Sequence, residues 1–376
     1  IEEPSPYALF LLTGYAGTGK TFLLRTIADL AQRAGLRVEL MASTGRAAKV
    51  LSASTGHPAS TIHRTIYRAS TQMQEEGGSF QLGRVSGATP TLFIVDEASM
   101  ISGDTGEMTP FGSGNLLDDL LSYVWSADEA KLIFVGDTAQ LPPVGTPLSD
   151  ALNAEVLTSR YGLHVYGMEL REVVRQKRGG ILHNATQLRE LLDEYADEDP
   201  EEILPIHLET EGWRGIFPVE GGTFIETLDE AYRKYGEEEC LVICPSNKLA
   251  LECNHAIRSS VLFYEEEPVV RGERLIVARN NYHYTKRPDR SDFIANGEII
   301  EVQRIGRHYY VYGLHFADAT IYLPDRDDSL DVRLLLTSLE DPTPQRSQAE
   351  RQRLFELIAA DYADIPSVTD RRKAIR

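Results

Sequence analysis

The chain has 376 residues, 42% of them hydrophobic, and a formal net charge of −19. This length is enough to bury a sizeable core and predicts two or three domains of a soluble globular protein. No apolar stretch approaches the roughly 20 residues that cross a bilayer, and the N-terminus lacks the basic and apolar regions of a signal peptide. Three cysteines are too few for a disulfide scaffold and favour a reducing compartment. We therefore expect a cytoplasmic protein without membrane partners.

The first chemical motif follows an apolar, strand-like run at residues 8–13. Residues 14–21 read GYAGTGKT, a complete G-x-x-x-x-G-K-T loop, and apolar residues at helical spacing follow it. In such a loop the backbone N–H groups and the helix N-terminus bind phosphates. Lys20 is then expected at the β and γ phosphates of a nucleoside triphosphate, with Thr21 on Mg²⁺. A glycine-rich turn that binds nothing is the alternative, which the flanking strand and helix disfavour.

The negative charge is unevenly distributed along the chain. Between residues 190 and 239, seventeen carboxylates stand against three basic side chains, which gives a local charge of −14. Residues 29–68 are instead locally basic, with six Lys and Arg residues against two carboxylates. Because phosphate backbones are bound by Lys and Arg, the overall acidity does not exclude nucleic acid. A solvated helix surface is the alternative interpretation of the basic stretch.

Strand-like runs alternate with amphipathic segments as far as about residue 170, a pattern typical of a doubly wound parallel α/β sheet. The predicted strands are 8–13, 37–42, 91–95, 131–136 and 163–167. Residues 69–90 interrupt the pattern with a Gly-Gly turn between two short extended arms, which predicts a hairpin projecting from the sheet. Residues 269–323 are rich in Val, Ile and Tyr with regular turn signals, which predicts a small antiparallel barrel.

Two carboxylates follow the buried strand 91–95 directly. Asp96 and Glu97 are therefore expected at the carboxyl edge of the sheet, where open α/β sheets bind ligands. At this position Asp96 would bind Mg²⁺ and Glu97 would act on the attacking water. A solvated acidic turn is the alternative. Cys240 and Cys244 share one face of another strand-like segment and are interpreted as packing residues rather than metal ligands.

The order of these motifs resembles superfamily 1 helicases, and within them the RecD-like and Dda-like branch. The resemblance rests on the loop at 14–21, STGRAA at 43–48, ASTIH at 59–63, DEAS at 96–99, GDTAQLPP at 136–143 and Arg175-Gln176. It implies two RecA-like domains, the second incomplete, with a hairpin in the first and an SH3-like barrel in the second. The implied ranges are 1–168 for the first domain with its hairpin at 69–90, 169–268 plus 324–376 for the second, and 269–323 for the barrel.

The resemblance also implies roles for single residues. Gln140 would sense the γ-phosphate, and Arg175 would act as an arginine finger from the second domain. An ordinary surface arginine is the alternative for Arg175. Lys20, Glu97, Gln140 and Arg175 are thus the expected catalytic residues, Thr21 and Asp96 the magnesium ligands. The residues expected to contact ATP are Gly14, Ala16, Gly17, Thr18, Gly19, Lys20, Thr21, Phe22 and Gln176.

Single-stranded DNA is the polymer that the resemblance implies. The residues that match its DNA-binding segments are Thr44, Arg46, Lys49, Thr61 and His63. Hydroxyl and basic side chains bind phosphates without reading sequence, and His63 would stack on a base unless it is a structural histidine. Phe80 is the aromatic residue near the hairpin turn. It would either stack on the last base pair as a duplex separates or anchor the hairpin to its domain.

These expectations together describe a monomeric, ATP-dependent and Mg²⁺-dependent DNA helicase that acts on single strands and at junctions with duplex. The RecD-like resemblance alone implies that it moves 5′ to 3′. A translocase that displaces proteins without unwinding, a nucleotide-switched DNA clamp without turnover and a small-molecule P-loop kinase are the alternatives. A kinase has no need of the segment 136–143. Two further helicase motifs, Thr-x-His-x-x-Gln-Gly and Tyr-x-x-x-Thr-Arg, are not found within these 376 residues.

Overall fold

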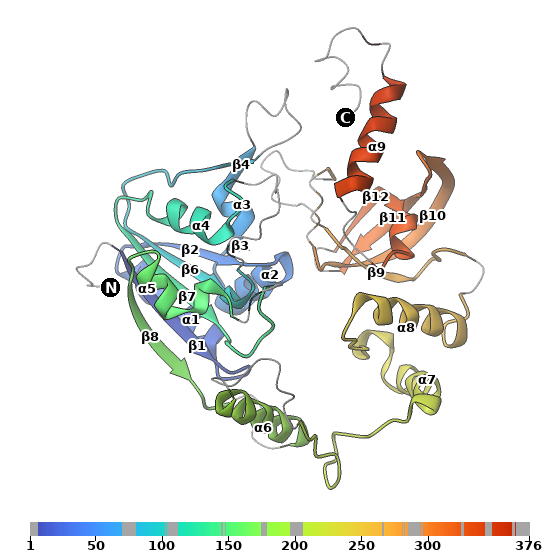
Figure 1. The fold of residues 1–376 in the computed structure, drawn as a ribbon, viewed down its shortest axis with the longest axis horizontal. Helices are drawn as coiled ribbons and strands as arrows, with labels where there is room; N and C mark the ends of the chain where they lie inside the picture. Colours follow the sequence, from blue (N-terminus) through green and yellow to red (C-terminus); the bar gives the residue numbers. More distant parts are fainter. Residues whose placement is uncertain are drawn as a thin grey trace. The chain divides into compact units, whose positions relative to one another are not determined.

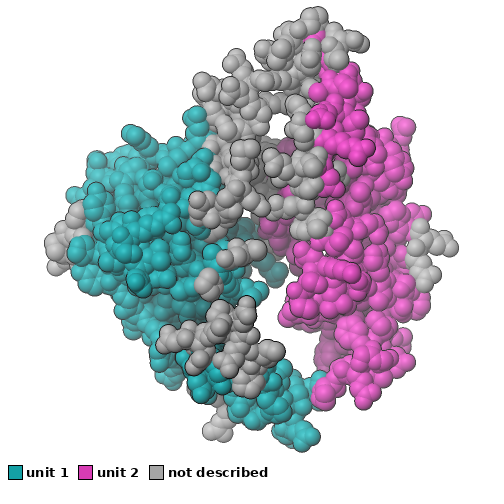
Figure 2. All heavy atoms as spheres, viewed as in Figure 1, with its two compact units in different colours: residues 1–217 teal, residues 218–376 magenta. Residues whose placement is uncertain are grey.

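The computed structural model divides into two compact units, residues 1–217 and residues 218–376 (Figure 2). The structure describes residues 7–69, 80–101, 103, 112–143, 146, 148–173, 179–195, 206–264, 267–279, 281, 283–284, 294, 296–324, 327–342, 348–362 and 365. Each unit has its own hydrophobic core. Within the described residues, no helix combines the length and the apolar character needed to span a bilayer.

The first unit is built on a parallel sheet of six strands in the order β3-β2-β6-β7-β1-β8 (Figure 1). The strands are β1 (Ala8–Gly14), β2 (Arg37–Ala42), β3 (Ala59–Thr61), β6 (Thr91–Asp96), β7 (Ala130–Gly136) and β8 (His164–Leu170). All five predicted strands are present, and the predicted α/β class with a parallel sheet is confirmed. The short β3 was not predicted, because three residues carry too little periodicity.

Helices cover both faces of this sheet. On one face, α1 (Lys20–Arg33) and α2 (Gly45–Thr55) bury Leu24 and Leu51 against the strands. On the other face lie α3 (Ile62–Ile66), α4 (Leu116–Val124) and α5 (Ala154–Ser159). Because both faces are covered, the central strands are apolar at nearly every position, as in the fully buried β6 segment 91–95.

The predicted hairpin begins as an antiparallel pair of short strands, β4 (Tyr67–Ala69) and β5 (Phe80–Leu82). The register pairs Tyr67 with Leu82 and Ala69 with Phe80. The turn at 70–79, including the Gly-Gly pair, lies outside the described residues, as does the side chain of Phe80. The projection of this segment from the sheet therefore stays a prediction.

The first unit extends further than the predicted boundary at residue 168. That boundary falls inside β8, whose residues pair with β1 from Ala8 to Gly14. Helix α6 (Gly180–Glu194) follows β8 and belongs to the same unit (Figure 1). Residues 206–217 then pack back onto α6, where Trp213 stacks on His183 and Asn184 hydrogen-bonds to the backbone of Glu209. The strand pairing and these contacts move the boundary to residue 217.

The second unit contains helices α7 (Phe224–Tyr235), α8 (Asn247–Ser260) and α9 (Gln348–Asp361) and one antiparallel sheet. The sheet has the order β12-β11-β10-β9, with strands β9 (Arg274–Ile276), β10 (Ile299–Val311), β11 (Leu314–Leu323) and β12 (Asp328–Leu335). It extends beyond the predicted range 269–323, because β12 pairs with the segment Phe316 to Leu323 of β11. Its closure into an SH3-like barrel stays a prediction.

The strand expected at residues 240–244 forms no ladder with any described residue. Leu241 and Ile243 are 85% and 87% exposed, so the apolar pattern of this segment is not matched by burial here. Cys240 and Cys244 are half-buried, and the sulfur atoms of Cys244 and Cys253 lie 3.8 Å apart. The described part of the second unit shows no parallel sheet, and a partial second RecA-like domain stays a prediction.

Candidate nucleotide-binding site

The glycine-rich loop joins the carboxyl end of β1 to the first turn of α1. Gly17 and Gly19 have φ angles of 81° and 91°, the left-handed region that glycine adopts without strain. A Cβ on Gly14 would lie 2.6 Å from the carbonyl oxygen of Leu170, so only glycine fits where β1 passes β8. The hydroxyl of Thr18 donates to the carbonyl of Tyr15 at 2.8 Å and closes the loop. The sequence therefore folds here into a closed glycine-rich loop at a helix N-terminus, a place where phosphates commonly bind.

Lys20 begins α1, and its ammonium group points back into this loop. Its Nζ donates to the carbonyl oxygens of Gly14 at 2.7 Å and Tyr15 at 3.0 Å. Burial lowers the pKa of Lys20, against the opposing effect of the carboxylates of Asp137, Glu97 and Asp96. Carbonyl oxygens are weaker partners for an ammonium group than phosphate oxygens, so a bound phosphate would compete well for this lysine.

The two predicted carboxylates end β6 at the same edge of the sheet. Asp96 is half-buried, and loss of water around its carboxylate raises its pKa to about 6, with a further contribution from the charge of Glu97. The N–H of Glu97 donates to the Asp96 carboxylate at 2.9 Å, which opposes the rise, as does Lys20. Glu97 itself has a φ of 54°, a left-handed conformation that is rare for this residue type and clusters at functional sites.

The predicted magnesium ligands fit the ion by their chemistry. Thr21 supplies a hydroxyl in the first turn of α1, and Asp96 supplies a carboxylate on the neighbouring edge. Mg²⁺ prefers such hard oxygen ligands and usually keeps several waters, so two protein ligands suffice. The pKa of Asp96 is raised by loss of water even with Lys20 nearby, and the positive charge of a divalent cation would stabilise the ionised carboxylate.

Gln140 lies in the loop that follows β7, next to the Asp96-Glu97 segment. Its Oε1 accepts a hydrogen bond from the hydroxyl of Ser99 at 3.1 Å. Ser99 is buried in the single turn that starts directly after Glu97. The structure thus brings the predicted γ-phosphate sensor to the carboxylate segment, 41 residues away along the chain.

An arginine that the sequence patterns did not indicate completes this edge. Arg189 on α6 pairs with Asp137 through two hydrogen bonds, of 2.7 and 3.1 Å, and Asp137 is only 1% exposed. The guanidinium also lies over the ring of Tyr15, with 4.0 Å between Cζ and the ring centroid. No motif marks Arg189, since it is one polar residue on an amphipathic helix. The buried Asp137 in the segment 136–143 was the signal that a cation had to lie nearby.

The remaining predicted nucleotide contacts stay predictions. Phe22 is on α1 and 77% exposed, and Ala16 and Gly19 are exposed in the loop. Arg175 and Gln176 lie outside the described residues, so the arginine-finger assignment stays a prediction.

The predicted DNA-contacting residues gather at the ends of the neighbouring strands β2 and β3. Thr44 and Thr61 cap helices α2 and α3, where their hydroxyls accept from the N–H groups of Ala47 and Arg64. The strands pair with Ala42 opposite Thr61, which places the two caps side by side. Arg46 and Lys49 follow on α2, with Arg46 exposed.

His63 is less accessible than the sequence suggested. It is half-buried, burial lowers its pKa, and its ring lies 5.7 Å from that of Tyr67. These contacts favour the structural-histidine alternative, although the residue borders the same edge as Thr61.

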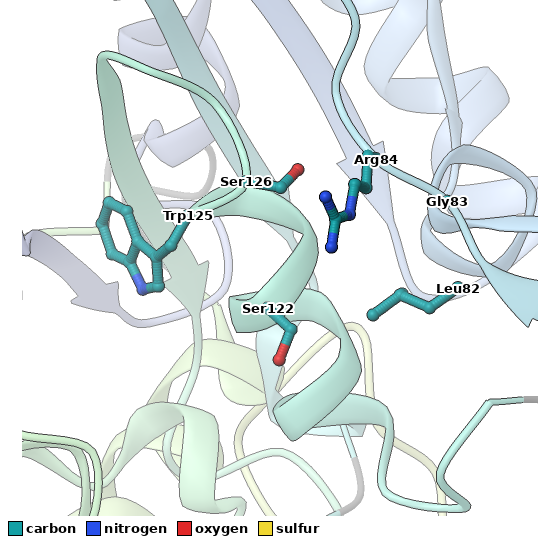
Figure 3. A pocket seen from close by; sticks show the side chains of 6 residues that line it. All are labelled: Leu82, Gly83, Arg84, Ser122, Trp125 and Ser126. Atoms are coloured by element: carbon teal, nitrogen blue, oxygen red, sulfur yellow. The ribbon is translucent and has the colours of Figure 1, made fainter.

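A separate cavity of about 580 Å³ lies at the root of the hairpin (Figure 3). It is lined by Leu82, Gly83, Arg84, Ser122, Trp125 and Ser126, and Arg84 reaches over it from the segment after β5. It contains none of the predicted nucleotide contacts, and the phosphate-binding geometry lies in the loop at 14–21 instead.

Comparison with known proteins identifies the family to which this chain belongs. A family model described as an AAA domain matches residues 4–204, which is more than half of the chain. The chain belongs to this AAA domain family. Its parallel sheet and glycine-rich loop both lie within the matched region.

Individual relatives confirm the predicted branch. The chain is 34% identical over 183 residues to the ATP-dependent RecD2 DNA helicase of Deinococcus radiodurans, which covers 49% of this chain and 23% of that protein. It is 26% identical over 306 residues to the ATP-dependent DNA helicase dda of Enterobacteria phage T4, with 77% and 62% covered. The chain therefore resembles superfamily 1 helicases of the RecD-like and Dda-like branch and spans about a quarter to three fifths of their length.

Among solved structures, the Pif1 helicase from Candida albicans matches with 18% identity and a TM-score of 0.35, over 88% of this chain and 75% of that one. A likeness at this level adds nothing to the fold described above.

Proposed function

We propose that the protein is an ATP-dependent DNA motor that hydrolyses ATP at the edge of the first unit's sheet and moves along single-stranded DNA, 5′ to 3′, separating duplex ahead of it. The observation that carries the proposal is the gathering of Lys20 with the carboxylates of Asp96, Glu97 and Asp137 at one edge. The names of the RecD2 and dda relatives, both ATP-dependent DNA helicases, supply the polymer.

The proposed hydrolysis uses groups that the fold already positions. Lys20 would exchange its two carbonyl partners for the β and γ phosphates, and the loop N–H groups would bind the same oxygens. Glu97 would accept the proton of the attacking water, and Gln140 would contact the γ-phosphate. Thr21 and Asp96 would hold Mg²⁺, which when bound supplies positive charge to the phosphate oxygens.

Coupling of ATP hydrolysis to DNA movement is supported by the proximity of the nucleotide-site residues to the DNA-contacting residues. The end of β2 pairs with the end of β6, with Ala42 opposite Asp96, so Thr44 follows a strand that adjoins the magnesium ligand. The hydroxyl of Ser43 contacts the sulfur of Met100, and Ser99 in the same turn contacts Gln140. A movement of Gln140 on loss of the γ-phosphate would thus be transmitted to the DNA-contacting edge over two side-chain contacts.

The first test is the ATPase rate of Lys20→Ala, with and without oligo-dT. We expect hydrolysis to fall at least a hundredfold, since the variant loses the charge that binds the phosphates. Lys248→Ala, at an exposed position on α8, is the matched control and should keep the wild-type rate. Unchanged hydrolysis in Lys20→Ala would contradict the site assignment.

The alternatives predicted from the sequence are separated by two further measurements. ATP hydrolysis that is stimulated by oligo-dT but accompanied by no opening of a forked duplex would favour a translocase that displaces proteins. Nucleotide-dependent DNA binding without turnover would favour a clamp. Unwinding of a duplex with a 3′ tail but not one with a 5′ tail would contradict the proposed polarity.

A further inference from the structure

Helix α6 presents one arginine to two separate parts of the candidate nucleotide site. The Nη2 of Arg189 lies 2.7 Å from Oδ2 of Asp137, and Nη1 lies 3.1 Å from Oδ1. This two-point pairing fixes the plane of the guanidinium as well as its position. The side chain of Asp137 is 1% exposed and that of Arg189 17% exposed, so water screens the pair weakly.

The same guanidinium stacks on the aromatic ring of the phosphate-binding loop. Its Cζ lies 4.0 Å from the ring centroid of Tyr15, within the range of a cation–π contact. The carbonyl of Tyr15 accepts hydrogen bonds from Lys20 and from both the N–H and the hydroxyl of Thr18. Arg189 therefore contacts the loop at the residue around which the loop folds.

Asp137 in turn shapes the loop that carries the proposed phosphate sensor. Its Oδ1 accepts from the N–H of Ala139 at 3.0 Å, and its carbonyl accepts from the N–H of Gln140 at 3.2 Å. Among the charged groups near Lys20, Asp137 has the largest raising effect on the lysine's pKa. A buried carboxylate this close to an ammonium group would form an ion pair with it if no other cation were present.

We propose that Arg189 is a positioning residue of the nucleotide site: it neutralises Asp137 through its two-point pairing, which keeps Lys20 available for phosphate. This inference rests on the proposed ATP site and names a residue that determines its affinity. The negative charge of Asp137 is thereby balanced by Arg189 of α6. Lys20 keeps its two carbonyl partners, which phosphate oxygens displace.

The test is nucleotide affinity, measured by fluorescence titration of the full chain with an N-methylanthraniloyl derivative of ADP. Arg189→Gln leaves Asp137 without its cation, so Lys20 is drawn to it and the Kd should rise at least tenfold. Replacing Asp137 as well, in Arg189→Gln/Asp137→Asn, removes the competing charge and should return the Kd to within about threefold of the wild type. Arg33→Gln, at an exposed position in the last turn of α1, is the matched control and should bind as the wild type does.

Two results with these variants would overturn the inference. One is a wild-type Kd in Arg189→Gln, and the other is a double variant that binds as weakly as the single variant, since a purely architectural arginine would not be compensated by removing a carboxylate. If Arg189→Gln does not fold, the nucleotide Kd of Arg189→Lys tests the inference instead. This variant keeps the positive charge and should bind within about threefold of the wild type, whereas a tenfold loss contradicts neutralisation. Absence of nucleotide binding in the wild type is a different outcome, which contradicts the proposed function itself.

Discussion

At the scale of single residues, Asp96 shows how burial and function oppose each other. Its pKa of about 6 arises mainly from loss of water around the carboxylate. The difference from the ordinary Asp pKa of 3.8 corresponds to roughly 3 kcal/mol of destabilisation once the buried group is ionised. The stabilising contribution of the protonated form is complete below 3.8 and is lost as the pH rises through about 6. The ionised form of this carboxylate is therefore unfavourable in the folded protein, at the position where a bound cation is expected.

The raised pKa of Asp96 predicts that Asp96→Asn changes the Tm by an amount that depends on pH, in the presence of a metal chelator. The variant does not ionise, so its Tm relative to the wild type should increase by about 4–8 °C between about pH 4.5 and about pH 7.5. Thermal unfolding followed by circular dichroism measures the difference. Asp128→Asn, at an exposed position, should show no such increase. The same Tm difference at both pH values would show that Asp96 titrates normally.

At the scale of elements, the strand-loop-helix unit of β1 and α1 depends on close packing against β8. A methyl group on Gly14 would meet the carbonyl oxygen of Leu170 at 2.6 Å and its Cβ at 2.9 Å. Neither atom is the flexible end of a side chain, so the backbone has to shift.

Gly14→Ala is accordingly expected to lower the free energy of unfolding by about 1–3 kcal/mol, through overpacking between β1 and β8. Denaturant unfolding gives this quantity directly. Gly215→Ala is the control, because a Cβ there meets nothing within 4 Å and should change the stability by less than about 0.5 kcal/mol. Equal stability of the two variants would contradict the close approach of β1 to β8.

The β4–β5 pair is the second element with a testable role. If the hairpin separates strands by stacking Phe80 on the last base pair, Phe80→Ala should slow the opening of a forked duplex about tenfold, since such stacking contributes about 1–3 kcal/mol per base. ATPase stimulated by oligo-dT should remain within twofold of the wild type. Gln81→Ala, at the exposed neighbouring position on β5, is the control. Undiminished unwinding in Phe80→Ala would favour the alternative that Phe80 anchors the hairpin.

At the scale of the whole molecule, the charge distribution decides how an acidic protein binds an acidic polymer. The net charge is −19, yet residues 29–68 are locally basic and include the DNA-contacting edge of β2 and β3. Binding that depends on local phosphate contacts releases counterions and weakens with salt in proportion to their number.

The affinity for oligo-dT is therefore expected to fall linearly on a double logarithmic plot against salt, with a slope of about −0.7 per phosphate contacted. Arg46→Ala should reduce the magnitude of that slope by about 0.7, because it removes one contact. Arg33→Ala, at the far end of α1 from the phosphate-binding loop, should leave the slope unchanged. Fluorescence anisotropy across a salt series measures the affinity of all three proteins, and a flat response would contradict the assignment of the DNA-contacting edge.

The local patterns of the chain specified much of the first unit. The apolar runs predicted five parallel strands to within three residues at each end, because strands buried on both faces leave little choice of residue type. The glycine pattern at 14–21 predicted the phosphate-binding loop, because φ angles such as that of Gly19 exclude most side chains. The second unit was less predictable: the apolar run 240–244 has the pattern of a strand, but pairing partners decide whether it becomes one.

What the sequence by itself determined was the set of local features: the strands, the loop, and the carboxylates that follow a strand end. Each depends on neighbours along the chain and on backbone geometry. The tertiary structure alone decided that Arg189, 52 residues beyond Asp137, would lie between it and Tyr15, and that His63 would be half-buried beside Tyr67. The physical reason is that a buried carboxylate requires a cation but does not specify which one, and only the packing of α6 onto the edge of the sheet made that choice.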